Sequence, residues 1–201
     1  MIKKVSVIDY GAGNLKSIVK ALKILGLNTE IIFVEQAGLN FLSKTDLLVL
    51  PGVGEFGSAV KVLGKVKNKI LDYVKQGKPL LGICLGIQLL FDKSEESHGK
   101  KGLGIISGEV VKFNKPTSDG RCLPVPHMCW NKVRFINLVG KKENKLKREI
   151  VKGLKKEEFF YFVHSYYPIP KEKEIIFGIT EYGKKFCSMI VKNNIVATQF
   201  H

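Results

Sequence analysis

The sequence has little of what marks secreted, membrane-spanning or metal-binding proteins. It holds four cysteines in 201 residues, and no two of them form a C-x-x-C pair. This spacing predicts neither a zinc site nor a disulfide framework. No apolar run approaches the roughly 20 residues that a membrane span needs, and the N-terminus lacks the apolar core of a signal peptide. We therefore expect a cytoplasmic protein with free thiols and no membrane segment.

Acidic residues are scarce relative to basic ones. The 18 Asp and Glu residues stand against 33 Lys and Arg, which leaves a net charge of +15. Such a charge invites a nucleic-acid hypothesis. However, the basic residues are nearly all lysines spread along the chain, and the densest run, 141–156, contains acids and no aromatic residue. We therefore do not expect nucleic-acid binding, and favour an acidic small molecule or partner.

The first half of the chain alternates between predicted strands and helices. Short apolar, β-branched runs predict strands at 5–8, 30–34, 47–50 and 79–83. Apolar residues at helical spacing predict helices over 15–25 and roughly 58–75, closed by Gly26 and Gly77. Strands that alternate with helices indicate right-handed crossovers and a parallel sheet.

The second half of the chain reads instead as antiparallel hairpins. Strand-like runs lie at 109–113, 132–136, 159–164, 174–180, 186–191 and 195–200. No repeat, low-complexity tract or linker divides the chain. We therefore predict one α/β domain over residues 1–201, with a mixed, mainly parallel sheet flanked by helices and antiparallel strands in its C-terminal half.

Cys84 lies between a predicted strand and a predicted helix, flanked by Gly82 and Gly86. A nucleophile on such a tight turn is held strained and exposed, and the glycines leave room for a substrate carbonyl. A following helix N-terminus favours the thiolate, and the N–H of Leu85 is placed to stabilise an oxyanion. On this motif alone, a buried structural cysteine remains an equal alternative.

A thiol nucleophile needs a base, usually a distant histidine that the fold brings close. His98 stands in a polar stretch and is expected at the surface. His201 ends a strand-like run, at the sheet edge where open α/β folds place their sites. On the residues alone, the base is either His164 or His201.

Several separated motifs together resemble the class I (triad-type) glutamine amidotransferases, and among them the glutaminase subunits of imidazole glycerol phosphate synthases. The resemblance spans nearly the whole chain. It rests on residues 8–14 (IDYGAGN), 50–54 (LPGVG), 82–91 (GICLGIQLLF), 94–96 (SEE), 102–104 (GLG), 126–128 with 130–131 (PHM, WN), 161–166 (YFVHSY), 180–182 (TEY) and 199–201 (QFH).

The resemblance implies a reaction and its principal groups. Cys84 would attack the side-chain amide of L-glutamine, with His201 as general base. Gly52 resembles the oxyanion strand, where a glycine peptide can turn an N–H toward the site beside that of Leu85. The enzyme would form a γ-glutamyl thioester, release ammonia and then hydrolyse the thioester to glutamate.

The resemblance also implies a substrate pocket and a partner. Gln88 and Glu96 resemble the residues that hold the amino-acid end of glutamine, and His164, Ser165 and Tyr166 resemble the lining of its pocket. The partner is a (β/α)₈-barrel cyclase subunit, which uses the ammonia to make imidazole glycerol phosphate in histidine biosynthesis. The turn at Tyr10 and residues 128–131 resemble the surface that faces it. No cofactor or metal is implied.

The sequence departs from the family pattern in three places. The family's catalytic histidine is followed by a proline and an orienting glutamate, whereas this chain stops at His201. Because every earlier motif is intact, we expect a piece of a longer protein that lacks its C-terminal segment. The alternative is an impaired protein that acts only as an interaction subunit. Cys129 stands where the family has glycine, and residues 114–125 form a longer stretch than usual.

Two further alternatives come from the same motifs. A paralogous amidotransferase could supply ammonia to a synthase that amidates a surface-glycan sugar, with the same glutamine chemistry. A cysteine-elbow hydrolase or chaperone of similar architecture would share Cys84, but it would not explain Gln88 together with the terminal Gln-Phe-His.

Overall fold

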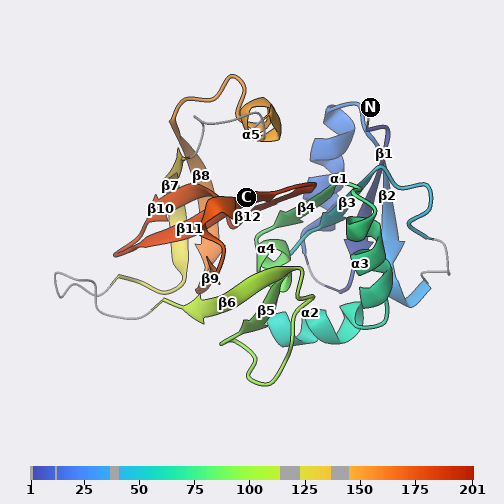
Figure 1. Cartoon of the computed structure of the whole chain (residues 1–201), viewed down its shortest axis with the longest axis horizontal. Helices are drawn as coiled ribbons and strands as arrows, with labels where there is room; N and C mark the ends of the chain where they lie inside the picture. The colour runs from blue at the N-terminus through green and yellow to red at the C-terminus, as the bar shows by residue number, and fades with distance from the viewer. Residues whose placement is uncertain (1, 12, 37–40, 114–122, 137–144) are drawn as a thin grey trace.

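The protein is described here by a computed structural model, which describes residues 2–11, 13–36, 41–113, 123–136 and 145–201. A nine-stranded mixed sheet runs through it (Figure 1). Its strands lie side by side in the order β2 (Asn28–Phe33), β1 (Lys4–Asp9), β3 (Leu47–Leu50), β4 (Leu80–Ile83), β12 (Ile195–Thr198), β11 (Lys185–Lys192), β10 (Ile176–Glu181), β7 (His127–Phe135) and β8 (Glu157–His164).

The large sheet has a parallel half and an antiparallel half. Neighbours from β2 to β12 pair in parallel, and neighbours from β12 to β8 pair antiparallel. The change of direction falls between β12 and β11, which belong to the C-terminal part of the chain. This arrangement confirms the predicted α/β class with its mixed sheet.

A smaller sheet of three strands lies beside the large one: β5 (Phe91–Ser94), β6 (Ile106–Lys112) and β9 (Tyr166–Pro170). The sequence predicted β6 but missed the other two. β5 carries only four residues, two of them charged, and β9 contains Pro168 and Pro170. Proline is tolerated only at sheet edges, and β9 is an edge strand that pairs with β6 alone.

The expected helix over 58–75 is in fact two helices, and this prediction was wrong. α2 (Phe56–Leu63) begins where the Glu55 carboxylate accepts the N–H groups of Gly57 and Ser58, at 2.7 and 2.6 Å. It ends at Gly64, and α3 (Lys67–Lys75) starts three residues later. Glycine is a weak helix former, so the chain turns there and folds α3 back onto the sheet.

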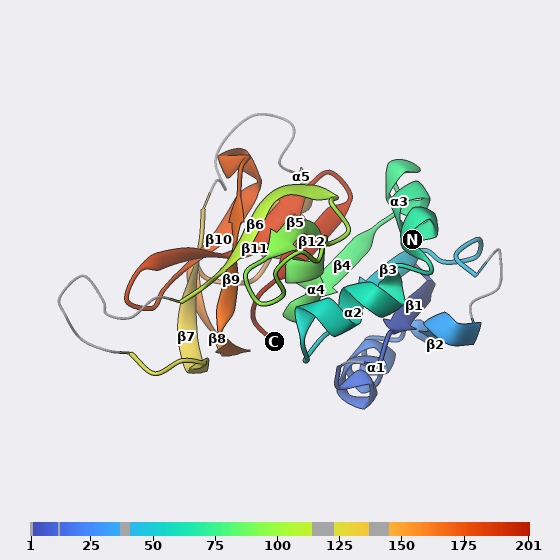
Figure 2. The ribbon, with the colours of Figure 1, turned by 90° about the horizontal axis from the view of Figure 1, so that it is seen from below.

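Helices cover both faces of the parallel half (Figure 2). α1 (Leu15–Ile24) buries Leu22 against Val5, Val7 and Val49. α2 and α3 pack on the opposite face in the larger core cluster, which includes Ile8 and Leu50. Alternate strand residues therefore face different helices, as the two-residue repeat of a strand requires. None of the helices in the described residues is long and apolar enough to cross a membrane.

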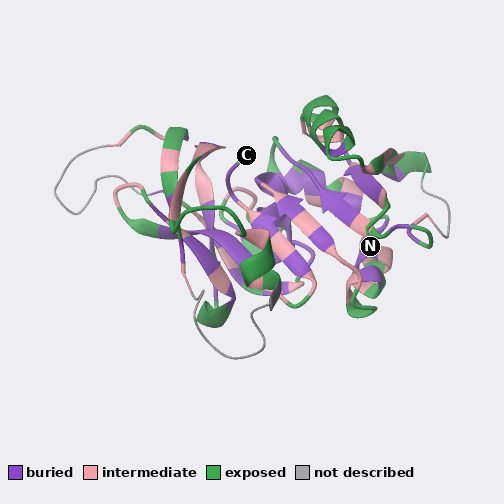
Figure 3. Ribbon diagram, turned by 90° about the horizontal axis from the view of Figure 1, so that it is seen from above, coloured by how far each residue is buried: buried purple, intermediate pink, exposed green. Residues whose placement is uncertain are grey.

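The carboxyl ends of β4 and β12 meet near the centre of the sheet, where buried and half-buried residues alternate along both strands (Figure 3). The two strands are parallel, with Ile83 in register with Thr198. Cys84 and residues 199–201 therefore leave the sheet side by side. Ligand sites of open α/β sheets lie at such carboxyl ends, so we expect the functional site beside the ends of β4 and β12.

Candidate active site

Cys84 forms a strained turn between β4 and the five-residue helix α4 (Leu85–Leu89). Its φ angle is +54°, which non-glycine residues rarely adopt, and its N–H donates to the Thr198 carbonyl at 2.7 Å. The glycines on either side are needed for close packing. A Cβ atom at Gly86 would lie 2.0 Å from the Leu50 carbonyl oxygen, and one at Gly82 would lie 3.0 Å from the Gly86 backbone. The tight strand-to-helix turn predicted at Cys84, here called the elbow, is present.

The Cys84 thiol is protonated in this conformation. Burial raises its pKa to about 12, although the Leu85 N–H and the Gln199 amide act in the opposite direction. The Leu85 N–H at the start of α4 lowers the pKa, as expected of a following helix, but burial raises it by more. The thiol therefore needs a base to become nucleophilic. Cys187 is also buried, whereas Cys122 lies outside the described residues.

Gly52 and Leu85, the two predicted oxyanion groups, lie against each other. The Leu85 N–H donates to the Gly52 carbonyl at 3.3 Å. The N–H that was predicted to stabilise an oxyanion is therefore already hydrogen-bonded. The Tyr10 hydroxyl donates to the Pro51 carbonyl and holds the same loop. An oxyanion could be stabilised here only after the Gly52 peptide turns its carbonyl away.

His201 differs from His164 in the freedom of its ring. The His201 backbone N–H donates to the Tyr161 carbonyl at 2.9 Å, and burial lowers the pKa of its imidazole. No hydrogen bond among the described residues uses the His201 ring. Both ring nitrogens of buried His164 are engaged instead. A neutral, unengaged imidazole is what a general base requires, so the geometry favours His201 over His164.

Gln88 is a buried residue rather than a helix-surface one. Its amide nitrogen donates to the Tyr166 carbonyl at 3.0 Å and to Oε1 of Gln199 at 3.1 Å. Nε2 of Gln199 in turn lies 3.7 Å from the Cys84 sulfur. Glu96 is half-buried and accepts the Phe56 N–H at 2.8 Å. The structure thus joins Gln88 to the thiol, and ties Glu96 to the start of α2.

Gln199 and His127, to which the sequence assigned no role, belong to the same network, together with Asn131, which the sequence placed only on the partner-facing surface. Gln199 contacts the thiol, and His127 and Asn131 continue from His164 toward the surface, at 3.1 and 3.2 Å. All three residues belong to motifs that carry the family resemblance, and this was the signal in the sequence that pointed to them. Ser165 contributes its carbonyl, which accepts the Phe113 N–H at 3.0 Å.

The buried imidazoles make acid destabilisation a testable property. Burial lowers the pKa of His127 to about 4 and that of His164 to about 3. The unfolded chain, with a histidine pKa of about 6.5, binds these protons first. Stability is therefore complete above about pH 6.5 and is lost as the pH falls, by about 2 kcal/mol for each imidazole at pH 5.

Urea unfolding at pH 7 and pH 5 measures this effect. The His127→Gln variant should lose about half of the pH dependence, because one of the two rings is gone. Equal free energies of unfolding of the original chain at the two pH values would contradict the burial of two neutral imidazoles.

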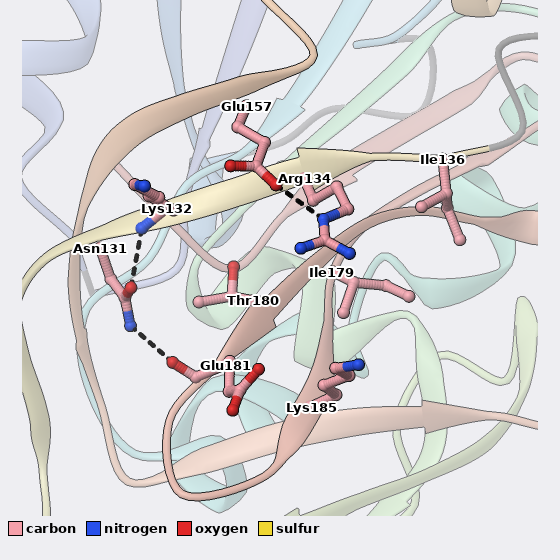
Figure 4. A pocket seen from close by; sticks show the side chains of 9 residues that line it. All are labelled: Asn131, Lys132, Arg134, Ile136, Glu157, Ile179, Thr180, Glu181 and Lys185. Atoms are coloured by element: carbon pink, nitrogen blue, oxygen red, sulfur yellow. Dashed lines mark hydrogen bonds and ion pairs between the residues drawn. The ribbon is translucent and has the colours of Figure 1, made fainter.

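The described residues outside the elbow were compared with it for a metal site and for a pocket. No cluster of three or more His, Cys, Asp or Glu side chains within them could hold a metal ion. An open pocket of about 310 Å³ lies over β7, β10 and β11, and is lined mainly by charged side chains (Figure 4). Cys84 and His201 are not among its lining residues, whereas Asn131 is.

Comparisons with known proteins find similarity over nearly the whole chain. Residues 6–201 match the family model described as glutamine amidotransferase class-I. The chain is 43% identical over 197 residues to the imidazole glycerol phosphate synthase subunit HisH of Methanocaldococcus jannaschii, covering 98% of this chain and 90% of that protein. It is likewise 43% identical over 197 residues to the HisH subunit of Aquifex aeolicus, covering 97% and 86%.

Solved structures with the same fold are more distant in sequence. A glutamine amidotransferase from Thermotoga maritima has a TM-score of 0.67 at 16% identity, covering 100% of this chain and 76% of that one. PurLQS from the same organism has a TM-score of 0.69 at 16% identity, covering 100% and 88%. At such identities the likeness concerns the fold alone.

Proposed function

The chain belongs to the class-I glutamine amidotransferase family, and on this premise we propose that Cys84 and His201 are the nucleophile and the general base of its glutaminase reaction. Its activity is that of the glutaminase subunit of imidazole glycerol phosphate synthase, in histidine biosynthesis. The observation that carries the assignment of residues is the elbow. Cys84 has a strained φ of +54° at the end of β4, and the segment with His201 leaves the neighbouring end of β12.

The reaction follows from the properties of these two groups. His201 takes the thiol proton, and the thiolate sulfur attacks the side-chain carbonyl carbon of glutamine. The tetrahedral intermediate collapses as the imidazolium returns the proton to the leaving nitrogen, which departs as ammonia. The remaining γ-glutamyl thioester is attacked by a water molecule that His201 deprotonates, which releases glutamate and restores the thiol.

The substrate pocket in this proposal lies between α4 and β9. Gln88 and the segment His164, Ser165 and Tyr166 line it, since the Gln88 amide meets the Tyr166 carbonyl. The half-buried carboxylate of Glu96 would hold the ammonium group of the substrate. Only Oε2 of Glu96 accepts the Phe56 N–H, so its other oxygen could accept from the ligand.

The partner in this proposal is a (β/α)₈-barrel cyclase subunit that receives the ammonia in a heterodimer. Met128, Trp130 and Phe159 on the neighbouring strands β7 and β8 are 61%, 67% and 56% exposed. Large exposed apolar side chains of this kind are typical of protein interfaces. A cytoplasmic location belongs to the same proposal, and the free thiols of Cys84, Cys129 and Cys187 suit a reducing compartment.

We expect the isolated chain to hydrolyse glutamine slowly and the barrel subunit to accelerate it by at least about 10²-fold, the usual value of one oxyanion donor. The reason is that, in the chain alone, the Leu85 N–H donates to the Gly52 carbonyl and is not free to stabilise an oxyanion. Glutamate formation, measured with and without the purified barrel subunit, tests this. Equal turnover in both samples would show that the oxyanion site needs no partner.

The paralogous amidotransferase for surface glycans is less favoured, because the relatives of about 40% identity are HisH subunits. A complementation experiment separates the two destinations. The gene should restore growth without histidine to a strain that lacks its own glutaminase subunit. If growth is not restored although the purified chain hydrolyses glutamine, the ammonia has another destination.

A further inference from the structure

A continuous series of hydrogen bonds, here called the relay, leads from strand β7 to the Cys84 thiol. Its polar side chains come from β7, β8, α4 and the segment after β12, so distant parts of the sequence meet in it. The side chains of the relay, from the surface inward, are Asn131, His127, His164, Gln88 and Gln199.

The outer end of the relay is oriented by backbone groups (Figure 4). Oδ1 of Asn131 accepts the Lys132 N–H at 2.7 Å, and Nδ2 of Asn131 donates to the Glu181 carbonyl at 2.9 Å. The amide is therefore held with its NH₂ group toward Nε2 of His127, 3.2 Å away. That ring nitrogen must accept, so the proton of neutral His127 lies on Nδ1.

The contacts of His164 give the same proton positions on the two rings, independently of Asn131. Nδ1 of His164 lies 2.7 Å from the Tyr166 carbonyl oxygen, which can only accept, so this nitrogen carries the proton. Nε2 of His164 is then an acceptor, and it faces Nδ1 of His127 at 3.1 Å. Both rings are neutral with the proton on Nδ1, and no other arrangement satisfies every contact.

The same logic extends to the thiol. The Tyr166 carbonyl also accepts from Nε2 of Gln88, and this nitrogen donates its second proton to Oε1 of Gln199. The Gln199 amide is thereby turned with Nε2 toward the Cys84 sulfur, at 3.7 Å. An N–H aimed at sulfur favours the thiolate, which is the form that attacks.

Packing leaves His127 no alternative hydrogen-bond partner in the part of the chain that the structure describes. Its ring is fully buried and lies between the rings of Phe162 and Tyr182, with centroid distances of 4.8 and 4.0 Å and interplanar angles of 24° and 26°. A buried polar ring that lost its partners would remain unsatisfied, at a cost of about 1–3 kcal/mol. The relay is therefore held as one unit, and a change at one side chain is passed to the next.

We infer that His127 is a positioning residue for glutamine hydrolysis. It acts through His164 and the Tyr166 carbonyl to orient the Gln88 amide toward Gln199, and thereby the Gln199 amide toward the Cys84 sulfur. This inference rests on the proposed function of Cys84. His127 has no hydrogen bond to the sulfur; it contacts His164 of the proposed pocket lining at 3.1 Å, and its effect reaches the thiol through the orientation of the groups between them.

The proton positions can be measured without any substrate. In the ¹⁵N-labelled full chain, NMR should show His127 and His164 as neutral rings with the proton on Nδ1. The Asn131→Asp variant places an acceptor opposite Nε2 of His127, so a proton should appear on that nitrogen. A proton on Nε2 of either ring in the unsubstituted chain would overturn the inference. This outcome is independent of whether the chain hydrolyses glutamine.

Two substitutions of His127 separate positioning from mere packing. Asparagine keeps a donor near the position of Nδ1, which is the side that faces His164, whereas glutamine keeps an acceptor near Nε2 only. With the barrel subunit present, His127→Gln should lower kcat/KM for glutamine by about 10²-fold, the effect expected of misplaced reacting groups. His127→Asn should recover most of this loss. Equal losses in the two variants would overturn the inference.

The reactivity of Cys84 toward iodoacetamide supplies a second readout, followed by mass spectrometry of its peptide. Loss of the Gln199 donor should slow alkylation in His127→Gln, whereas simple loosening of the core would expose the thiol and speed it. Faster alkylation would therefore count against positioning. Tyr182→Phe keeps a ring stacked on His127 and leaves the relay intact, so it should match the unsubstituted chain in both assays.

Discussion

Replacement of Cys84 by alanine is expected to lower glutamine hydrolysis by at least about 10³-fold, because the proposed nucleophile, which would form the thioester, is removed. The fold should survive. The backbone contact to the Thr198 carbonyl does not involve the side chain, and alanine occupies less space than the thiol. Glutamate formation in the presence of the barrel subunit gives the rate, and circular dichroism reports the fold.

A second buried thiol of the chain provides a matched control. Cys187 is buried in β11, so Cys187→Ala tests a buried thiol away from the elbow. This variant should keep glutaminase turnover within a few-fold of the original. Hydrolysis that persisted in Cys84→Ala would show that Cys84 is not the nucleophile. A complete lack of hydrolysis by the unsubstituted chain with its partner would instead support the impaired interaction subunit.

Replacement of Gly86 by alanine is expected to destabilise the protein by about 3 kcal/mol or more, or to prevent folding. The added Cβ would lie 2.0 Å from the Leu50 carbonyl oxygen, on the backbone of β3 at the centre of the sheet. A flexible side chain could move aside, but a strand paired on both sides cannot shift without breaking its ladder. Urea unfolding measures the loss.

Gly77→Ala is the control for the loss of a glycine as such. Gly77 follows α3 with φ +76°, and nothing lies within 4 Å of the added Cβ. The cost there is only that of a left-handed conformation, about 1 kcal/mol. If Gly86→Ala were as stable as Gly77→Ala, the close approach of α4 to β3 would not be the reason for the glycine.

Much of the fold follows from local sequence, and the errors have physical causes. The parallel strands and α1 were predicted because their apolar residues repeat at strand or helix spacing. The break at Gly64 was missed because a single glycine is tolerated in many helices. β9 was missed because its prolines argue against a strand, and only its position at the edge of the small sheet makes them acceptable.

The proposed reacting groups, Cys84 and His201, were also predicted from the sequence, whereas the hydrogen bonds around them were not. The motif around Cys84 and the terminal His201 suggested both groups, but on the residues alone His164 was as good a base as His201. Only the folded chain engages both nitrogens of the His164 ring and leaves the ring of His201 without a hydrogen bond among the described residues. Local sequence cannot reveal this, because the partners of His164 come from β7 and β9.

By itself, the sequence determined the class of fold, the elbow and the family, since these depend on residue types at short spacing. The tertiary structure decided which donors and acceptors meet. The Leu85 N–H is held by the Gly52 carbonyl, and the Gln199 amide is turned toward the Cys84 sulfur by contacts that begin on a distant strand. Hydrogen bonds depend on distances within a few tenths of an ångström between parts of the chain far apart in sequence, and only packing sets those distances.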